Sequence, residues 1–348
     1  MRAKRCITAV FAVISCAVFG CIFVLRPQSN VFGTAATEGR AECVMEASSR
    51  RILYESNGDS RLPMASTTKI LTAITVLSEC ADLEEKITIP RQAEGVEGSS
   101  VYLKQGDTYT ARDLLYGLML RSGNDCAVAL ALHYGKTIGE FAVKMNKIAE
   151  QAGALDSQFS NPHGLPCENH YTTARDLASI TCFAMQNPIF REIVATKYYD
   201  PCGWKNKNKL LFSLDGSIGV KTGYTKEAGR CLVSAVEREG MTIVSVVLAC
   251  GPMYERSEEL LCDAYNLYHN TLLLGAETPL KIQNGNTEMR GVTHKNYYYP
   301  LADGEKEHLE IKTRPKKDAY DEIKGEIIGQ FEIYLSKRLI FSGNLYKL

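Results

Sequence analysis

The period of the apolar residues changes several times along this 348-residue chain, and the order of those changes restricts the fold more than any other feature. Short alternating segments between Glu42 and Glu55 predict two strands joined by a turn. Apolar residues at helical spacing then predict a group of helices: one introduced by Pro63, a pair within 111–135, and two more at 138–152 and 173–186. Strand-like runs return at 232–236 and 242–248, and a further helix is predicted at 256–274. Strands on both sides of a helical group predict an α+β fold, with an antiparallel sheet covered by helices.

The amino terminus carries an uncharged apolar run from Cys6 to Leu25, preceded by three basic residues. A run of about 20 residues is long enough to span a bilayer as a helix, and basic residues before it favour a cytoplasmic amino terminus. The run fits an uncleaved anchor or a cleaved signal peptide, for which the small residues at 33–36 could supply a cleavage site. Either interpretation predicts that the rest of the protein works outside the cytoplasm, at the outer face of the membrane or after secretion.

After Ala276 the sequence changes to short alternating segments with Gly and Asn turns, which predicts a small all-β domain. We therefore divide the chain into a signal or anchor segment at 1–26, a linker at 27–40, a main domain at 41–275 and a β-rich domain at 276–348.

The balance of charges and the cysteines exclude some classes of function. The 40 basic and 40 acidic residues cancel, which argues against a nucleic-acid partner. Nine of the 12 cysteines follow the apolar run, an odd number without a C-x-x-C pair. We expect them to be buried small hydrophobes rather than a disulfide framework, and we expect no metal site and no cofactor.

The first motif with chemical content is Ser66-Thr67-Thr68-Lys69, near the start of a predicted helix. Residues i and i+3 share a helix face, so Lys69 lies beside Ser66. A serine nucleophile needs a base, and Lys69 can be that base if the pKa of the lysine is lowered. The helix start also offers free N–H groups to a developing oxyanion. S-x-x-K arises by chance about once or twice in a chain of this length, so the pair alone is weak evidence.

Two further motifs follow in the chain. Ser122-Gly123-Asn124 breaks a helix pair, where a loop can present a hydroxyl and an amide to a cleft. The same triplet recurs at 342–344, which we take to be an ordinary turn in a terminal β-hairpin. Lys221-Thr222-Gly223 leads into the strand pair, where a cation and a hydroxyl suit a substrate carboxylate and a glycine permits close approach of a peptide.

Together, in this order, the three motifs resemble the linked set of β-lactamases and penicillin-binding proteins. The chain is similar to the low-molecular-mass penicillin-binding proteins, the serine D-alanyl-D-alanine carboxypeptidases of peptidase family S11. The similarity covers residues 40–275 strongly and the β-rich tail loosely. It includes the segments Leu62–Ala65, Asn161–Leu165, Thr173–Leu177, Gly223–Thr225 and Ala228-Gly229. It implies a penicillin-binding transpeptidase-like main domain.

The resemblance also implies roles for individual residues. Ser66 would attack the bond between two D-alanines and form an acyl-enzyme, and Lys69 would take its proton. Ser122 would complete the proton path, and the N–H groups of Ser66 and Tyr224 would form the oxyanion hole. Substrate contacts are implied for Asn124, Lys221, Thr222, Gly223, Tyr224 and Arg256. The implied partners are peptidoglycan stem peptides ending in D-Ala-D-Ala, β-lactam antibiotics as covalent inhibitors, and the membrane through the amino-terminal segment.

Some features depart from the family pattern. Gly123 stands where the β-lactamase motif has aspartate, although glycine is usual in this carboxypeptidase group, and Ile218-Gly219-Val220 replaces a frequent Asp-Gly before the third motif. The family's frequent carboxyl-terminal membrane helix is missing, so we expect the amino-terminal run to tether the protein.

Alternative functions remain open at this point. A class A β-lactamase would add a deacylating glutamate, and no E-x-x-L-N follows the second motif. A catalytically inactive wall-binding protein is disfavoured by the complete set of polar residues. A Ser-His-Asp hydrolase lacks G-x-S-x-G, and a zinc peptidase lacks H-E-x-x-H, so His163 and His170 are expected to be structural.

Overall fold

The computed structural model describes Phe32, residues 39–316 and residues 324–348. They belong to one compact unit that runs from Val31 to Leu348. The predicted signal or anchor segment lies outside the described residues. Among the described helices, none combines the length and the hydropathy needed to cross a bilayer.

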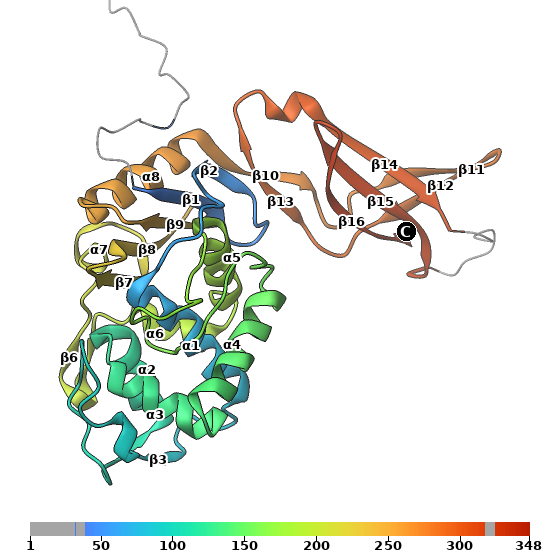
Figure 1. The fold of residues 1–348 in the computed structure, drawn as a ribbon. Coiled ribbons are helices and arrows are strands. Elements are labelled where there is room, and N and C mark those ends of the chain that lie inside the picture. Colours follow the sequence, from blue (N-terminus) through green and yellow to red (C-terminus); the bar gives the residue numbers. More distant parts are fainter. Residues whose placement is uncertain (1–31, 33–38, 317–323) are drawn as a thin grey trace, which may run out of the picture. The chain divides into compact units, whose positions relative to one another are not determined.

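A five-stranded antiparallel sheet organises the main part of the molecule, with the strand order β2-β1-β9-β8-β7 (Figure 1). Its strands are β1 (Ala41–Glu46), β2 (Ile52–Ser56), β7 (Ser217–Thr225), β8 (Gly229–Arg238) and β9 (Met241–Leu248). Strand β1 pairs with β2 on one side and, on the other, with β9 from the far end of this part of the chain, as the predicted α+β fold requires. Strand β7 forms one edge of this sheet, which leaves its outer side free to border a site.

Helices cover both faces of the sheet (Figure 1). Alternate residues of a strand point to opposite faces, so Cys43 packs into the larger helical core while Val44 packs towards helix α8. The helices are η1 (Ala65–Thr68), α1 (Lys69–Glu79), η2 (Arg91–Ala93), α2 (Ala111–Tyr116), the π-turn η3 (Gly117–Arg121), α3 (Asn124–Gly135), α4 (Ile138–Gln151), α5 (Ala174–Ala184), α6 (Pro188–Ala195), η4 (Asp200–Cys202), α7 (Leu210–Ser213) and α8 (Met253–Leu267).

Helix α1 is the centre of the helical layer. All of its residues from Lys69 to Val76 are buried, which confirms the expectation of a helix buried on most sides. The apolar residues reflect this position, because a helix with neighbours all round needs no polar stripe. Lys69 is the charged residue in this buried stretch, and its burial costs free energy that a purely structural helix would avoid.

The carboxyl-terminal region is all-β, as predicted. Strand β10 (Tyr268–Leu274) pairs with β13 (Tyr297–Ala302). A second five-stranded sheet has the order β11-β12-β16-β15-β14, with strands β11 (Leu280–Asn284), β12 (Thr287–Val292), β14 (Leu309–Pro315), β15 (Ile327–Leu335) and β16 (Arg338–Lys347). Short pairs β3 (Lys86–Thr88) with β4 (Thr108–Thr110) and β5 (Tyr198–Tyr199) with β6 (Trp204–Lys205) complete the strands.

Arg51 connects the first hairpin to this region. Its guanidinium donates to the Pro300 carbonyl at 2.6 Å and to both carboxylate oxygens of Glu305 at 2.8 and 2.5 Å. It also lies 5.0 Å from the centre of the Tyr268 ring. These contacts join residues on both sides of the boundary predicted at 275/276, and that boundary stays a prediction.

Two sequence predictions are wrong. The helix predicted to reach residue 274 ends at Leu267, and Tyr268–Leu274 is a strand. Tyr268 and Thr271 suit a pleated surface, and pairing with β13 decides the conformation of a segment that no glycine or proline separates from the preceding helix. The triplet at 342–344 is the interior of β16 rather than a turn, because the hairpin turns at Ser336 and Lys337, both with positive φ.

Candidate active site

Ser66 lies in the 3₁₀ turn that leads into α1, and the chain is bent sharply just before it. Ala65 has φ 50°, a left-handed conformation that costs free energy for a residue with a Cβ. The turn places Ser66 and Lys69 on one face, with Lys69 Nζ 3.0 Å from Ser66 Oγ. The spacing predicted from the sequence therefore becomes a direct polar contact.

Lys69 Nζ has two further neighbours, each at 2.6 Å: the side-chain oxygen of Asn124 and the carbonyl oxygen of His163. The amide of Asn124 is oriented by its nitrogen, which donates to the Glu97 carbonyl at 2.5 Å. Both neighbours of Nζ can only accept hydrogen bonds. A neutral amine would give its two hydrogens to them, which leaves its lone pair for the hydroxyl proton of Ser66.

The electrostatic environment favours that neutral amine. Complete burial, followed by the ammonium of Lys221, holds the pKa of Lys69 well below its ordinary value. Burial and the nearby charge of Lys207 lower the pKa of Lys221 in turn, to about 7. Desolvation and like charge therefore make Lys69 available as a proton acceptor at neutral pH.

The second motif lies at an irregularity between two helices. The π-turn η3 ends at Ser122, which has φ 65° and ψ 31°. Helix α3 begins at Asn124, whose backbone N–H donates to the Ser99 carbonyl at 2.7 Å. A π-turn inserts an extra residue into a helix and often marks a functional position. Here it directs Ser122 into the same cavity as Ser66.

The third motif lies on the edge strand β7. A side chain at Gly223 would bring its Cβ to 3.0 Å from the Met64 carbonyl and 3.2 Å from the backbone nitrogen of Ser66. Glycine therefore lets β7 approach the turn that carries Ser66 without displacing the backbone of that turn. Lys221 does not line the cavity: it is buried, and its ammonium donates to the Thr222 carbonyl at 2.8 Å. Its charge lowers the pKa of Lys69, and its expected contact with a substrate stays a prediction.

These three segments meet at a cavity of about 320 Å³. Its lining residues are Ser66, Ser99, Ser122, Lys207, Thr222, Gly223, Tyr224, Arg230, Met253 and Tyr254. Two of them are cationic and, among the described residues that line it, none carries a carboxylate. The cavity is therefore suited to a ligand with negative charge.

Arg256 does not take the position that the sequence predicted for it. Its guanidinium is buried and donates to both carboxylate oxygens of the buried Glu42, at 3.0 and 2.8 Å, and to Glu259 at 2.9 Å. It is absent from the residues that line the cavity. Its bonds to two carboxylates hold the guanidinium apart from the lining residues, so the structure does not bring Arg256 to the other motif residues, and the substrate-binding role expected for it stays a prediction.

Arg230 lies where a cation was expected. It is exposed, lines the cavity and faces Tyr224 across the β7–β8 pair, with its guanidinium 5.9 Å from that ring. Sequence reasoning missed Arg230, although the pairing register of the two strands would have placed it opposite Tyr224. Residues that pair directly across two strands share a face, so an arginine opposite Tyr224 borders whatever Tyr224 borders.

One buried group near the motifs, the carboxylate of Asp125, was also missed. The carboxylate of Asp125 accepts from Ser100 Oγ at 2.6 Å and from the backbone N–H groups of Val101 and Leu103 at 3.0 and 3.1 Å. It thereby holds the loop that carries Ser99. Its position directly after Asn124, in the first turn of a helix, was the available signal.

His170 supports the nucleophile turn. Its Nδ1 accepts from the Ser160 N–H at 3.0 Å, so the proton of the neutral ring lies on Nε2, which is 3.0 Å from Thr68 Oγ1. Burial and the charge of Lys69 lower the pKa of His170 to about 4. The structural role expected for His163 and His170 agrees with these contacts, and His163 adds the carbonyl that Lys69 contacts.

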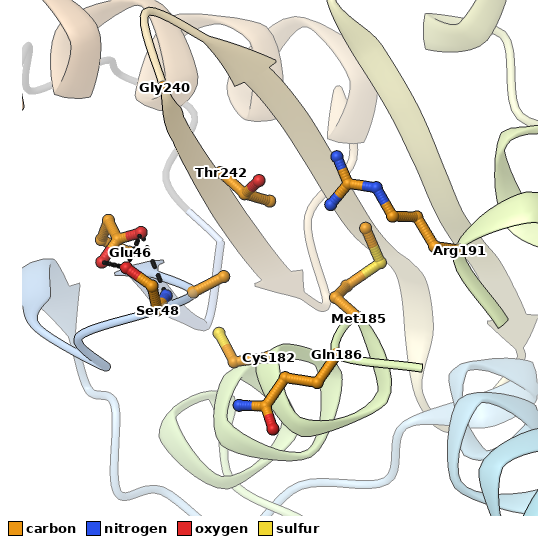
Figure 2. A pocket seen from close by; sticks show the side chains of 9 residues that line it. Glu46, Ser48, Cys182, Met185, Gln186, Arg191, Gly240 and Thr242 are labelled. Atoms are coloured by element: carbon orange, nitrogen blue, oxygen red, sulfur yellow. Dashed lines mark hydrogen bonds between the residues drawn. The ribbon is translucent and has the colours of Figure 1, made fainter. Parts of the chain in front are cut away.

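A second cavity, of about 190 Å³, contains none of the motif residues (Figure 2). The carboxylate of Glu46 is occupied there by the backbone and hydroxyl of Ser48, and Arg191 is paired with Glu237. Burial raises the pKa of the Cys182 thiol that borders it, which makes this cysteine a poor nucleophile. Among the described residues, no group of three or more His, Cys, Asp or Glu is arranged to hold a metal ion.

Comparison with known proteins identifies close relatives of this arrangement. The model of the D-alanyl-D-alanine carboxypeptidase family (Peptidase_S11) matches residues 29–251. A D-alanyl-D-alanine carboxypeptidase from Streptomyces sp. (strain K15) is 40% identical over 220 residues, 57% of this chain and 76% of that protein. The D-alanyl-D-alanine carboxypeptidase DacF of Bacillus subtilis is 32% identical over 65% of this chain, and the match spans 61% of that protein.

Solved structures extend the similarity to the carboxyl-terminal region. The crystal structure of the D-alanyl-D-alanine carboxypeptidase DacD from Francisella tularensis has a TM-score of 0.70 at 26% identity, covering 91% of this chain and 94% of that chain. Penicillin binding protein 5 from Haemophilus influenzae has a TM-score of 0.74 at 25% identity, covering 91% and 98% of the two chains.

Proposed function

This chain belongs to the D-alanyl-D-alanine carboxypeptidase family, and we propose that it removes the terminal D-alanine from peptidoglycan peptides through an acyl-enzyme on Ser66. One observation carries the proposal. Lys69 Nζ lies 3.0 Å from Ser66 Oγ, while its other two contacts are groups that can only accept hydrogen bonds. This arrangement activates a serine hydroxyl. The fold alone would not require a buried lysine at this position.

In the acylation step, Ser66 Oγ attacks the carbonyl carbon between the two D-alanines and its proton passes to Lys69 Nζ. The backbone N–H groups of Ser66 and Tyr224 stabilise the oxyanion that develops on the carbonyl oxygen. The proton then moves from Lys69 to the amine of the leaving D-alanine, with the Ser122 hydroxyl as the relay. The carbon–nitrogen bond breaks, and an ester on Ser66 remains.

Deacylation consumes water. Its oxygen attacks the ester carbon while Lys69 accepts one of its protons, and Ser66 regains a hydroxyl. The products are D-alanine and a peptide shortened by one residue, and the enzyme returns to its initial state. Burial of Lys69 serves both half-reactions, because its pKa must permit proton uptake and release at one pH.

The terminal carboxylate of the substrate binds at the Thr222 end of the cavity. Thr222 supplies a hydroxyl on the edge strand, and Arg230 supplies the cation in place of Arg256. A charge-assisted hydrogen bond to a carboxylate is about twice as strong as a neutral one, so this contact distinguishes a free carboxyl terminus from an internal peptide bond.

β-Lactam antibiotics are the second ligand class in this proposal, as covalent inhibitors that acylate Ser66. In class A β-lactamases, rapid hydrolysis of the drug uses a glutamate that activates water at the acyl-enzyme. The described lining residues include no carboxylate, so we expect the penicilloyl ester to persist. This distinguishes the proposed function from that of a β-lactamase.

We further propose that the protein works on the outer side of the cytoplasmic membrane, held by its amino-terminal apolar segment or released after signal cleavage. The uncharged run from Cys6 to Leu25 supports this location, together with a substrate that is part of the cell wall.

The proposed function is tested by incubating the full chain with a synthetic pentapeptide that ends in D-Ala-D-Ala and measuring free D-alanine. Wild-type protein should release one D-alanine per peptide, and Ser66→Ala should reduce the rate by at least about 1,000-fold. The matched control is Ser213→Ala, which alters an exposed serine of helix α7 and should leave the rate unchanged. Absence of D-alanine release by a folded wild-type chain would contradict the proposal.

A further inference from the structure

The segment Lys205-Asn206-Lys207-Asn208-Lys209 alternates between exposed and buried residues. All three lysines are exposed, whereas Asn206 and Asn208 are only 5% and 1% exposed. We call Lys205, Lys207 and Lys209 the lysine strip. Three neighbouring cations repel one another, so a sequence that presents them together without need would be disfavoured.

The buried asparagines fix the backbone of the strip. The Asn206 amide nitrogen donates to the Thr196 carbonyl at 3.0 Å, and its oxygen accepts from the Asn208 N–H at 2.9 Å. The oxygen of Asn208 accepts in turn from the Leu210 N–H at 3.1 Å. These local hydrogen bonds replace a regular ladder, and they keep the lysines directed outward.

The strip is continuous with the catalytic cavity. Lys207 lines that cavity, and its ammonium lies 3.3 Å from Ser99 Oγ. The ammonium of Lys209 lies 5.6 Å from the centre of the Tyr254 ring, which also lines the cavity. A ligand that leaves the cavity on this side therefore meets the neighbouring cations of the strip.

Beyond the cavity, the strip continues onto an exposed aromatic pair. Lys205 Nζ lies 4.7 Å from the Phe212 ring and 5.6 Å from the Tyr198 ring, and these rings are 41% and 57% exposed. Between residues 197 and 212 the sequence has four lysines and one acidic residue, Asp200. Adjacent exposed aromatic and cationic side chains are typical of a recognition surface rather than of a solvated loop.

We propose that the lysine strip binds carboxylates in the part of the peptide substrate that precedes the scissile bond, so that the enzyme selects acidic peptides. The inference rests on the proposed function, which places the peptide's terminal carboxylate at Thr222 and Arg230. The rest of the peptide must then leave the cavity past its other lining residues, among which Lys207 leads to the strip. Complementary charge and this continuity favour an acidic peptide over a lipid surface as the occupant.

The test measures binding, so that it does not depend on turnover. The full-length Ser66→Ala protein in detergent is titrated with two N-acetyl pentapeptides that end in D-Ala-D-Ala and differ only in glutamate or glutamine at residue 2. We expect the glutamate peptide to bind about fivefold more tightly at low salt, and we expect this preference to shrink as NaCl is added.

Charge reversal at the two ends of the strip, Lys205→Glu with Lys209→Glu, should abolish or invert the preference and leave binding of the glutamine peptide within about twofold. Neither residue lines the catalytic cavity. The control carries the same change of charge at two exposed lysines of the β-rich region, Lys306→Glu with Lys324→Glu, and should retain the full preference.

Equal binding of the two peptides to the parent protein would overturn the proposal. So would an unchanged preference in the strip variant, or an equal loss of preference in the control, which would assign the effect to net charge. Equal peptide binding together with strip-dependent binding to phosphatidylglycerol vesicles would assign the strip to lipid instead. The binding preference could depend on the strip while the wild-type protein, which keeps Ser66, releases no D-alanine. That result would support the binding role of the strip and contradict the proposed function.

Discussion

Lys69 and Lys221 form a pair in which one buried cation changes the chemistry of the other. Lys221 does not line the cavity, yet its ammonium is the largest charge effect that lowers the pKa of Lys69. The sequence indicated both lysines, because their motifs belong to the linked set of β-lactamases and penicillin-binding proteins. It could not indicate that both lysines are buried and that the charge of one lowers the pKa of the other, because burial depends on packing between segments far apart in the chain.

The pair leads to a prediction about pH. Acylation by penicillin requires neutral Lys69, so its rate should fall as pH decreases through the pKa of that lysine. Lys221→Met removes a positive neighbour, makes protonated Lys69 less unfavourable and raises its pKa. The acidic limb of the acylation profile should therefore move to higher pH. Stopped-flow acylation over a pH series measures it, and an unmoved limb would show that Lys221 does not set the base.

The same scale shows a limit of sequence reasoning. Arg256 and Arg230 differ little in the sequence, since both are arginines near the later strands. Glu42 decides between them, because it lies opposite Arg256 in the folded chain and neutralises it. A partner 214 residues away cannot be inferred from a local motif.

At the scale of elements, the loop that carries Ser99 depends on helix α3. The Asp125 carboxylate at the start of that helix accepts the hydroxyl of Ser100 and the N–H groups of Val101 and Leu103. The loop has little regular structure of its own, so these hydrogen bonds, together with those from Asn124 to the Glu97 and Ser99 carbonyls, hold it in place. A change of the Asp125 carboxylate should therefore weaken the attachment of the loop.

Asp125→Asn should lower the free energy of unfolding by about 1–3 kcal/mol, because an amide NH₂ group would face backbone N–H donors that now point at a carboxylate oxygen. Urea denaturation followed by circular dichroism measures the loss. Asp156→Asn is the matched control: that carboxylate forms an exposed ion pair with Arg61, so it should change stability by less than about 1 kcal/mol. Equal effects at the two positions would refute the role given to Asp125.

The main elements could be predicted because each has a strong period or a clear break. The helix pair around Ser122 and the hairpin of β8 and β9 are of this kind. Strand β10 could not be predicted, since no glycine or proline separates it from the preceding helix and its pairing with β13 cannot be read from the sequence. Short strands such as β5 and β6 have too few residues to show any period.

At the scale of the whole molecule, two buried histidines connect the site to the stability of the fold. Burial lowers the pKa of both His163 and His170 from 6.5 to about 4. The unfolded chain therefore binds more protons than the folded chain between these pH values. Their contribution to stability is complete above about pH 6.5 and is lost as pH falls towards 4.

His170→Gln should reduce this pH dependence, because glutamine can still donate to Thr68 but takes up no proton. Across that range the variant should lose about 1–3 kcal/mol less stability than the wild type. Urea titrations at a series of pH values test this, with His308→Gln at an exposed position as the control. A variant with the wild-type dependence would exclude His170 as a source of acid sensitivity.

The arrangement of the whole chain was predictable in outline only. Its α+β core and its β-rich end follow from changes of period that the sequence displays. The contacts of Arg51 with Pro300 and Glu305 do not follow from the sequence pattern. They connect the two predicted domains, which lie in one compact unit. The predicted boundary between the domains therefore gives no information on how independently they fold.

The central claim is that Ser66 is the nucleophile, and covalent labelling tests it most directly. The full chain is incubated with a fluorescent penicillin, digested and mapped by mass spectrometry. We predict one label per chain, on the peptide that contains Ser66, and a label that persists because the described lining residues include no carboxylate to activate water. A label on any other residue, or none on folded protein, would contradict the account.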